Sequence, residues 1–133
     1  MSELKIIKRQ DNFNYLPFAV ESLIRIEKPK GRIYISGPAA KIIGIKEGEK
    51  VAFAFSEYEA YIFKSNDDDA FLLRRRENED RLQFTAKCLL LPFDNFNKVH
   101  KYNKNNYKIS PVFKLIEKKE MFPIRINSLG QAL

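Results

Sequence analysis

The segment from residue 31 to residue 55 constrains the fold of this chain more than any other. It reads GRIYISGPAAKIIGIKEGEKVAFAF, in which two runs of alternating apolar and polar residues, typical of β-strands, flank a short apolar patch. Ser36 is a good helix N-cap, Gly44 suits a left-handed C-cap, and Gly48 falls in a tight polar turn before the second run. The segment therefore predicts a strand, one short helix near residues 38–43, and a second strand.

The rest of the sequence also favours β structure. Aromatic residues make up 13% of the chain, with 11 Phe, 6 Tyr and no Trp, and aromatic side chains are enriched in strands. Residues 18–26 alternate as a strand does, although a helical face can be drawn through them as well. We expect a mainly β fold of the α+β class: a small barrel of short strands with one helix near 38–43. Whether the barrel has two related halves stays open.

Turn-forming residues separate several more predicted elements further along the chain. Residues 59–76 read as a β-hairpin, and residues 81–93 predict a strand, a turn and an apolar element. Residues 95–108 are rich in Asn and Lys and predict a long exposed loop. Residues 109–126 predict two strands joined by a turn, and Pro123 places the second at a sheet edge or a bulge.

The sequence pattern divides the chain into three parts. Residues 1–26 are predicted to form an N-terminal arm with strands, residues 27–76 a β unit, and residues 77–133 a second β-rich half. One internal echo links the last two parts: RIYISGPAAKII at 32–43 and RLQFTAKCLLL at 81–91 share the order Arg, apolar, polar, apolar, hydroxyl, at an offset of 49 residues. A duplication and a chance match both explain this echo.

Ten positions of the central unit match, without gaps, a known pattern of glycine, arginine and apolar residues. They are Gly31, Arg32, Ile33, Ile35, Ile43, Gly44, Ile45, Gly48, Glu49 and Val51. Through them the segment 27–76 resembles the AbrB/MazE-type swapped-hairpin (SpoVT-AbrB-like) family of DNA-binding proteins. The resemblance implies a barrel made of two interleaved copies that regulates transcription. Two positions differ: Ser36 stands where the family has proline, and Ala40 where it has a helix arginine that contacts DNA.

The charge of the chain points in the same direction. Lysine and arginine number 24 against 17 acidic residues, a formal net charge of +7, which favours an anionic partner such as DNA. The predicted nucleic-acid-binding face comprises Arg25, Lys28, Lys30, Arg32 and Lys41. The second candidate is the segment 98–108, where lysines alternate with Tyr102 and Tyr107, an arrangement suited to single strands. Each cluster also fits a solvated surface.

The predicted function is therefore that of a DNA-binding transcriptional regulator. The alternative is a non-catalytic structural or protein-interaction module that uses the same β unit without touching nucleic acid. The alternative is motivated by Ala40 and by the C-terminal half, which the resemblance does not cover.

Several other functions are disfavoured by what the sequence lacks. The one cysteine, Cys88, lies in an apolar run and is expected to be buried and inert, and with the one histidine, His100, it makes no zinc site. No nucleotide-binding, cofactor-binding or nucleophile motif occurs, so we expect no enzyme, no cofactor and no metal. No signal peptide or membrane-spanning run is seen, which predicts a cytoplasmic protein with no membrane partner.

The expected assembly is a homodimer. Strand-rich halves of roughly 50 residues bury too little surface to be stable alone, so two chains would complete one barrel. If residues 81–127 instead form a second equivalent unit, the chain closes on itself as a monomer.

Overall fold

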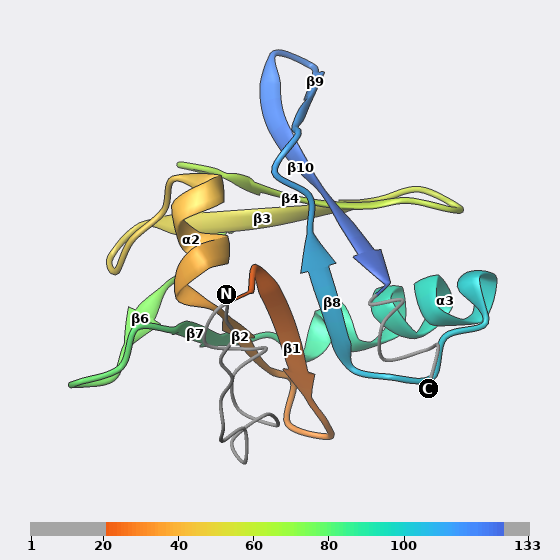
Figure 1. The fold of residues 1–133 in the computed structure, drawn as a ribbon, viewed down its shortest axis with the longest axis horizontal. Helices are drawn as coiled ribbons and strands as arrows, with labels where there is room; N and C mark the ends of the chain where they lie inside the picture. The colour runs from red at the N-terminus through yellow and green to blue at the C-terminus, as the bar shows by residue number, and fades with distance from the viewer. Residues whose placement is uncertain (1–20, 127–133) are drawn as a thin grey trace, which may run out of the picture.

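The computed structural model describes residues 21–126, within which ten strands form one antiparallel sheet (Figure 1). The strands are β1 (Leu23–Glu27), β2 (Arg32–Ile35), β3 (Lys50–Phe55), β4 (Ala60–Lys64), β5 (Phe71–Leu72), β6 (Arg74–Arg75), β7 (Leu82–Thr85), β8 (Asn106–Ile109), β9 (Lys114–Ile116) and β10 (Lys119–Ile126). The helical elements are α2 (Gly37–Ile43), the 3₁₀ helix η2 (Lys87–Leu89) and α3 (Leu90–His100).

The sheet curls into a nearly closed barrel. Its strand order is β5-β3-β4-β10-β8-β1-β2-β7-β6, with β9 added to β10. The two end strands, β5 and β6, are separated in the chain only by Leu73, which is 1% exposed. The ring of strands is thus closed by the covalent chain that runs from β5 through Leu73 to β6. The helices α2 and α3 lie on opposite sides of the ring (Figure 1). The prediction of a mainly β, barrel-like α+β fold is confirmed.

Hairpins from the two halves of the chain interleave in this ring. The β1–β2 hairpin lies between β8 and β7, and it does not pair with β3, the strand that follows it in the chain. The β3–β4 hairpin lies between β5, the strand that follows it in the chain, and β10 of the C-terminal half. In the ring, the paired strands β10 and β8 of the C-terminal half stand between these two N-terminal hairpins, so the two halves of one chain interleave.

The pairing of β2 with β7 follows a local two-fold symmetry. Tyr34 lies opposite Gln83, and these residues are 49 positions apart. Arg25 on β1 pairs with Tyr34, and Arg74 on β6 pairs with Gln83, again with 49 positions between the two arginines. The echo in the sequence thus corresponds to two equivalent hairpins facing each other. The homodimer stays a prediction, but a chain that pairs its own halves has no need of a second copy to close the barrel.

The short helix α2 forms where the sequence predicts it. The Ser36 hydroxyl accepts from the amides of Ala39, at 3.3 Å, and Leu23, at 2.9 Å, so it caps the helix and ties it to β1. Gly44 ends the helix with a φ of 81°, in the left-handed region that glycine adopts at low cost. These contacts place α2 against the barrel with Ala39, Ala40 and Ile43 buried.

The prediction of only one helix is wrong, and so is the exposed loop at 95–108. Residues 90–100 form α3, and Asn106–Ile109 form β8. Phe93 and Phe96, three positions apart, face the core, because residues at this spacing share one side of a helix. The buried Asn97 side chain accepts from the Tyr107 hydroxyl at 2.7 Å. Asparagine-rich sequence predicts a loop, whereas Asn97 joins α3 to β8.

Three smaller predictions also need correction or refinement. Residues 59–76 are not a hairpin, since β5 pairs with β3 and not with β4. Pro123 lies inside β10, not at a sheet edge. On one side β10 pairs with β4, and on the other side it pairs first with β9 and then with β8. Pro123 lies in the gap between the residues that pair with β9 and those that pair with β8. A residue without an amide hydrogen is tolerated in such a gap. Cys88 is exposed, not buried.

Candidate nucleic-acid interface

The strands β1, β2 and β7 present one polar face to the outside of the barrel. Successive side chains on a strand point to opposite faces, and Ile24, Ile26, Ile33 and Ile35 are all buried in the core. Arg25, between Ile24 and Ile26, and Arg32, directly before Ile33, therefore point outward. The same alternation on β7 buries Leu82 and Phe84 and leaves Gln83 half-buried.

Four arginines occupy this outer face, and we call them the arginine face: Arg25, Arg32, Arg74 and Arg81. Arg25 and Arg74 stand at the two ends of one row across the sheet, with Tyr34 and Gln83 between them. Arg32 and Arg81 are 49 positions apart, as Arg25 and Arg74 are. The local two-fold therefore relates the four side chains as two pairs.

Tyr34 contacts three of these arginines. The Arg81 guanidinium stands 4.2 Å from the centre of the Tyr34 ring, and that of Arg25 stands 5.3 Å from it. A hydrogen bond with Tyr34 is the main cause that raises the pKa of Arg32 above its ordinary value. Stacking on an aromatic ring fixes a guanidinium without neutralising it, although Arg81 also forms an ion pair with Glu79 at 3.0 Å. Tyr34 therefore holds the cations in place and is itself only 5% exposed.

A hollow of about 370 Å³ opens on the β7 side of the arginine face, and we call it the arginine hollow. Its lining residues are Arg32, Phe71, Leu72, Arg74, Arg76, Gln83, Phe84 and Thr85. Among residues 21–126, no carboxylate oxygen lies within 4.0 Å of Arg74 or Arg76, and the nearest to Arg32 is on Glu27, at 3.9 Å. Three guanidinium groups thus line one open hollow with almost no internal neutralisation. Phosphate oxygens are suitable partners for such groups.

The five residues predicted from the sequence are only partly brought together. Arg25 and Arg32 lie on the arginine face. Lys28 and Lys30 are exposed in the β1–β2 turn, and the Lys28 ammonium forms an ion pair with Asp94 of α3 at 2.6 Å. Lys28 is therefore engaged in holding that turn against α3. Lys41 lines a different cavity, beside α2.

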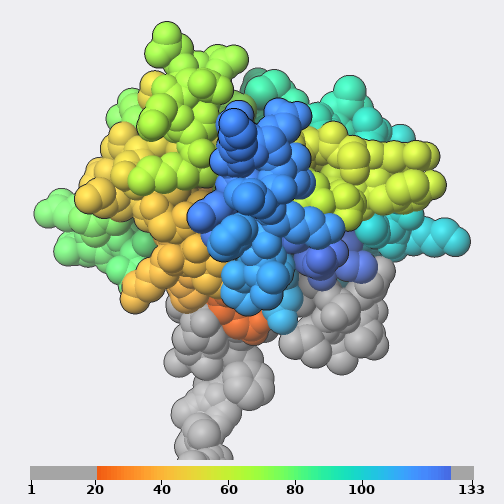
Figure 2. Space-filling model, turned by 90° about the horizontal axis from the view of Figure 1, so that it is seen from above, coloured from red at the N-terminus to blue at the C-terminus, as the bar shows by residue number. Residues whose placement is uncertain are grey.

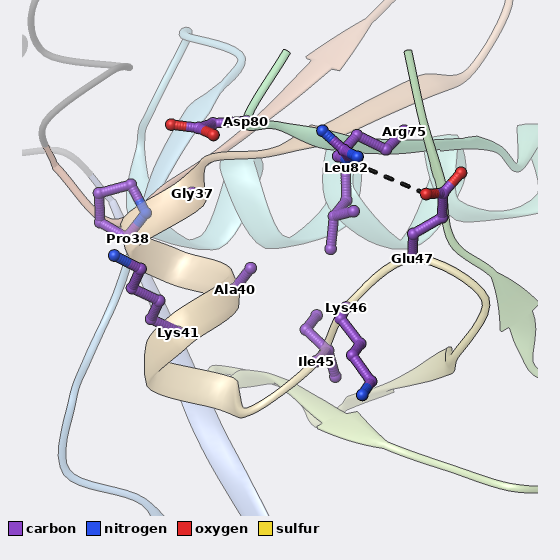
Figure 3. Close-up of a pocket in the computed structure, with 10 residues that line it drawn as sticks. All are labelled: Gly37, Pro38, Ala40, Lys41, Ile45, Lys46, Glu47, Arg75, Asp80 and Leu82. Atoms are coloured by element: carbon purple, nitrogen blue, oxygen red, sulfur yellow. Dashed lines mark ion pairs between the residues drawn. The ribbon is translucent and has the colours of Figure 1, made fainter. Parts of the chain in front are cut away.

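The cavity beside α2 has a mixed charge (Figure 3). Its volume is about 570 Å³, and it is lined by Gly37, Pro38, Ala40, Lys41, Ile45, Lys46, Glu47, Arg75, Asp80 and Leu82. Arg75 pairs with Glu47 at 3.7 Å and donates to the Glu79 carbonyl at 3.1 Å, and Asp80 adds a second carboxylate to the wall. This cavity is less suited to a polyanion than the arginine hollow, because its own acids offset its cations.

Sequence reasoning missed Arg74, Arg76, Arg81 and Gln83. The run at 74–76 stands at the end of the predicted β unit 27–76, whereas in the structure it begins the second copy of the hairpin that carries Arg25 and Arg32. The echo at 49 residues was the available signal, since it maps Arg25 onto Arg74 and Arg32 onto Arg81.

The segment 98–108 does not form the predicted stacking site. Phe96, Tyr102 and Tyr107 are all buried, and the Tyr107 ring packs 4.9 Å from the Phe93 ring, centre to centre. Burial also raises the pKa of the Tyr107 hydroxyl above its ordinary value. These rings belong to the core, so no base can stack on them without unfolding α3.

A scan against protein-family models and searches of curated proteins and of solved structures return no match to this chain. Within residues 21–126, no helix is long and apolar enough to cross a membrane. In the same range, no group of three or more His, Cys, Asp or Glu side chains is placed to hold a metal ion. The interpretation of the site therefore depends on its own geometry and charge.

Proposed function

We propose that this protein binds double-stranded DNA through the arginine face, as a non-catalytic cytoplasmic regulator of transcription. The observation that carries the proposal is the convergence of Arg32, Arg74 and Arg76 on one open hollow with almost no carboxylate nearby. Guanidinium groups without a nearby carboxylate form strong ion pairs with phosphates, and the DNA releases its bound counterions when they do so.

The two-fold arrangement favours a duplex over other polyanions. The strands of a DNA duplex are related by local two-fold axes, and DNA-binding proteins commonly place equivalent residues about such an axis. Here Arg25 and Arg32 of one hairpin have Arg74 and Arg81 as their counterparts in the other. One chain therefore supplies both halves of the interface.

The test is a fluorescence-anisotropy titration of the protein against a labelled duplex of about 20 base pairs and mixed sequence. If four of the five arginines of the face and the hollow each replace a counterion, log K should fall with log salt with a slope between about −3 and −4. Binding should then weaken about a hundredfold between 50 and 200 mM salt, with one chain per site. No binding at micromolar protein and 50 mM salt would contradict the proposal.

A protein-interaction module remains the second candidate, because of the β9–β10 hairpin, which projects from the barrel (Figure 1). Val112, Phe113 and Leu115 lie at this hairpin and are 73%, 43% and 70% exposed. In the space-filling view, its blue surface occupies the middle of the face turned to the viewer (Figure 2). Exposed apolar side chains gathered in one place are typical of protein contacts. A module of this kind would bind no duplex in the titration above.

A further inference from the structure

The centre of the arginine face differs between the two hairpins. By the local two-fold, Tyr34 of β2 and Gln83 of β7 occupy equivalent positions, directly opposite each other. Four arginines stand around this pair at positions that the two-fold relates, so the symmetry of residue types is broken at the central pair.

The two central side chains have different surroundings. Tyr34 is enclosed by the guanidinium groups of Arg25 and Arg81 and is only 5% exposed. Gln83 is half-buried and lines the arginine hollow, and within residues 21–126 its amide group has no hydrogen-bond partner. An amide presents a donor and an acceptor side by side. In the centre of the arginine face, the Gln83 side-chain amide is therefore the polar group that can hydrogen-bond a ligand.

We propose that Gln83 reads a base pair in the major groove, with its amide oxygen and nitrogen paired to N6 and N7 of an adenine. This inference rests on the proposed function, since it assumes a duplex on the arginine face. Glutamine is one of the two side chains that make this bidentate contact with adenine. The arginines around it reach phosphates and hold the register.

The dimensions of the sheet agree with this placement. The major groove is about 12 Å wide and admits a two-stranded β-ribbon. Neighbouring strands are about 4.8 Å apart, so β1 and β6, three intervals apart, are separated by roughly 14 Å. The outer face of a barrel is convex, which makes β2 and β7 its crest. The ribbon β2–β7 can therefore face the bases while Arg25 and Arg74 reach the backbones on either side.

Of the two central side chains, only Gln83 is available to contact a base. The protein should therefore bind a duplex in one preferred orientation. A symmetric face with two reading groups would accept either orientation on a duplex, whereas Gln83 alone distinguishes them. The preferred site should consequently have one adenine-specific position and no matching second position across the two-fold axis.

The experiment selects bound duplexes from a random pool and sequences them, with the parent protein, Gln83→Met and the control Lys98→Met. Methionine has a similar length and no amide, and Gln83→Ala is a second variant, checked for folding by circular dichroism. For the parent and the control we expect enrichment of one A·T pair by about fivefold or more. Both Gln83 variants should lose this preference while their affinity for unselected duplex and their salt slope stay unchanged.

The other outcomes overturn the inference in distinguishable ways. If the parent binds duplex but enriches no position, or if both Gln83 variants keep the preference, Gln83 does not read a base, and the proposed function stands. If the parent binds no duplex, or prefers single strands to duplex, the proposed function fails as well. That failure is visible in the titration before any sequence is read.

Discussion

Replacing both Arg74 and Arg76 with alanine should weaken duplex binding by about tenfold or more at low salt and reduce the salt slope by nearly two units. The reason is that both guanidinium groups line the arginine hollow, with no carboxylate within ion-pair distance among residues 21–126. Since both residues are exposed, the thermal midpoint should change little. Fluorescence anisotropy at several salt concentrations measures the first effect, and circular dichroism the second.

A matched control separates this site from the general charge of the protein. Lys98→Ala with Lys118→Ala removes the same charge from exposed positions on α3 and in the β9–β10 turn, away from the arginine face. We expect that variant to bind with nearly the parent's affinity. Equal losses in the two double variants would mean that the net charge of +7, and not a particular face, accounts for binding.

Gly31→Ala should be strongly destabilising, by about 2–5 kcal/mol. Gly31 has a φ of 76°, and a Cβ atom there would lie 2.8 Å from the Lys87 Cα and 2.9 Å from the Lys87 nitrogen. The Gly31 carbonyl also accepts from the Ala86 amide at 2.8 Å, so the β1–β2 turn is packed directly against the end of β7. The chain has little room to move away. Urea denaturation measures the change in the free energy of unfolding.

Gly44→Ala is the control for this prediction. Gly44 has a similar φ of 81°, but nothing lies within 4 Å of the position that its Cβ would take. Its substitution should cost only the strain of the left-handed backbone, about 1–2 kcal/mol. If the two variants lose equal stability, the close approach of Gly31 to β7 contributes nothing to the fold.

The parts of the fold that follow from local sequence were predictable. Ser36 and Gly44 mark the ends of α2, and alternation marks β2 and β3, because capping and side-chain direction are local properties. The helix α3 was missed because its second half, residues 95–100, begins an Asn- and Lys-rich stretch that predicts a loop. The asparagine at position 97 is explained by tertiary contacts, since its side chain accepts from the Tyr107 hydroxyl and donates to the Lys104 carbonyl.

Only part of the candidate site was predictable, because its residues come from two hairpins that are far apart in the sequence. Arg25 and Arg32 could be found from the first hairpin alone. Their counterparts Arg74 and Arg81 become neighbours only through the pairing of β2 with β7, a contact between residues about 50 positions apart. Such non-local pairing leaves no local signal, and the echo that reveals it is short. Lys41 was included because it is close to Arg32 in the chain, but it lines a separate cavity.

The most direct test of the central claim is a titration of isotope-labelled protein with a short duplex, followed by nuclear magnetic resonance. Binding at the arginine face predicts that the largest shift changes occur at backbone amides of β2, β6 and β7 and at the side-chain signals of Arg32, Arg74 and Gln83. Signals of the β9–β10 hairpin and of α2 should stay in place. Changes confined to that hairpin or to the cavity beside α2, or no changes at all, would contradict the account.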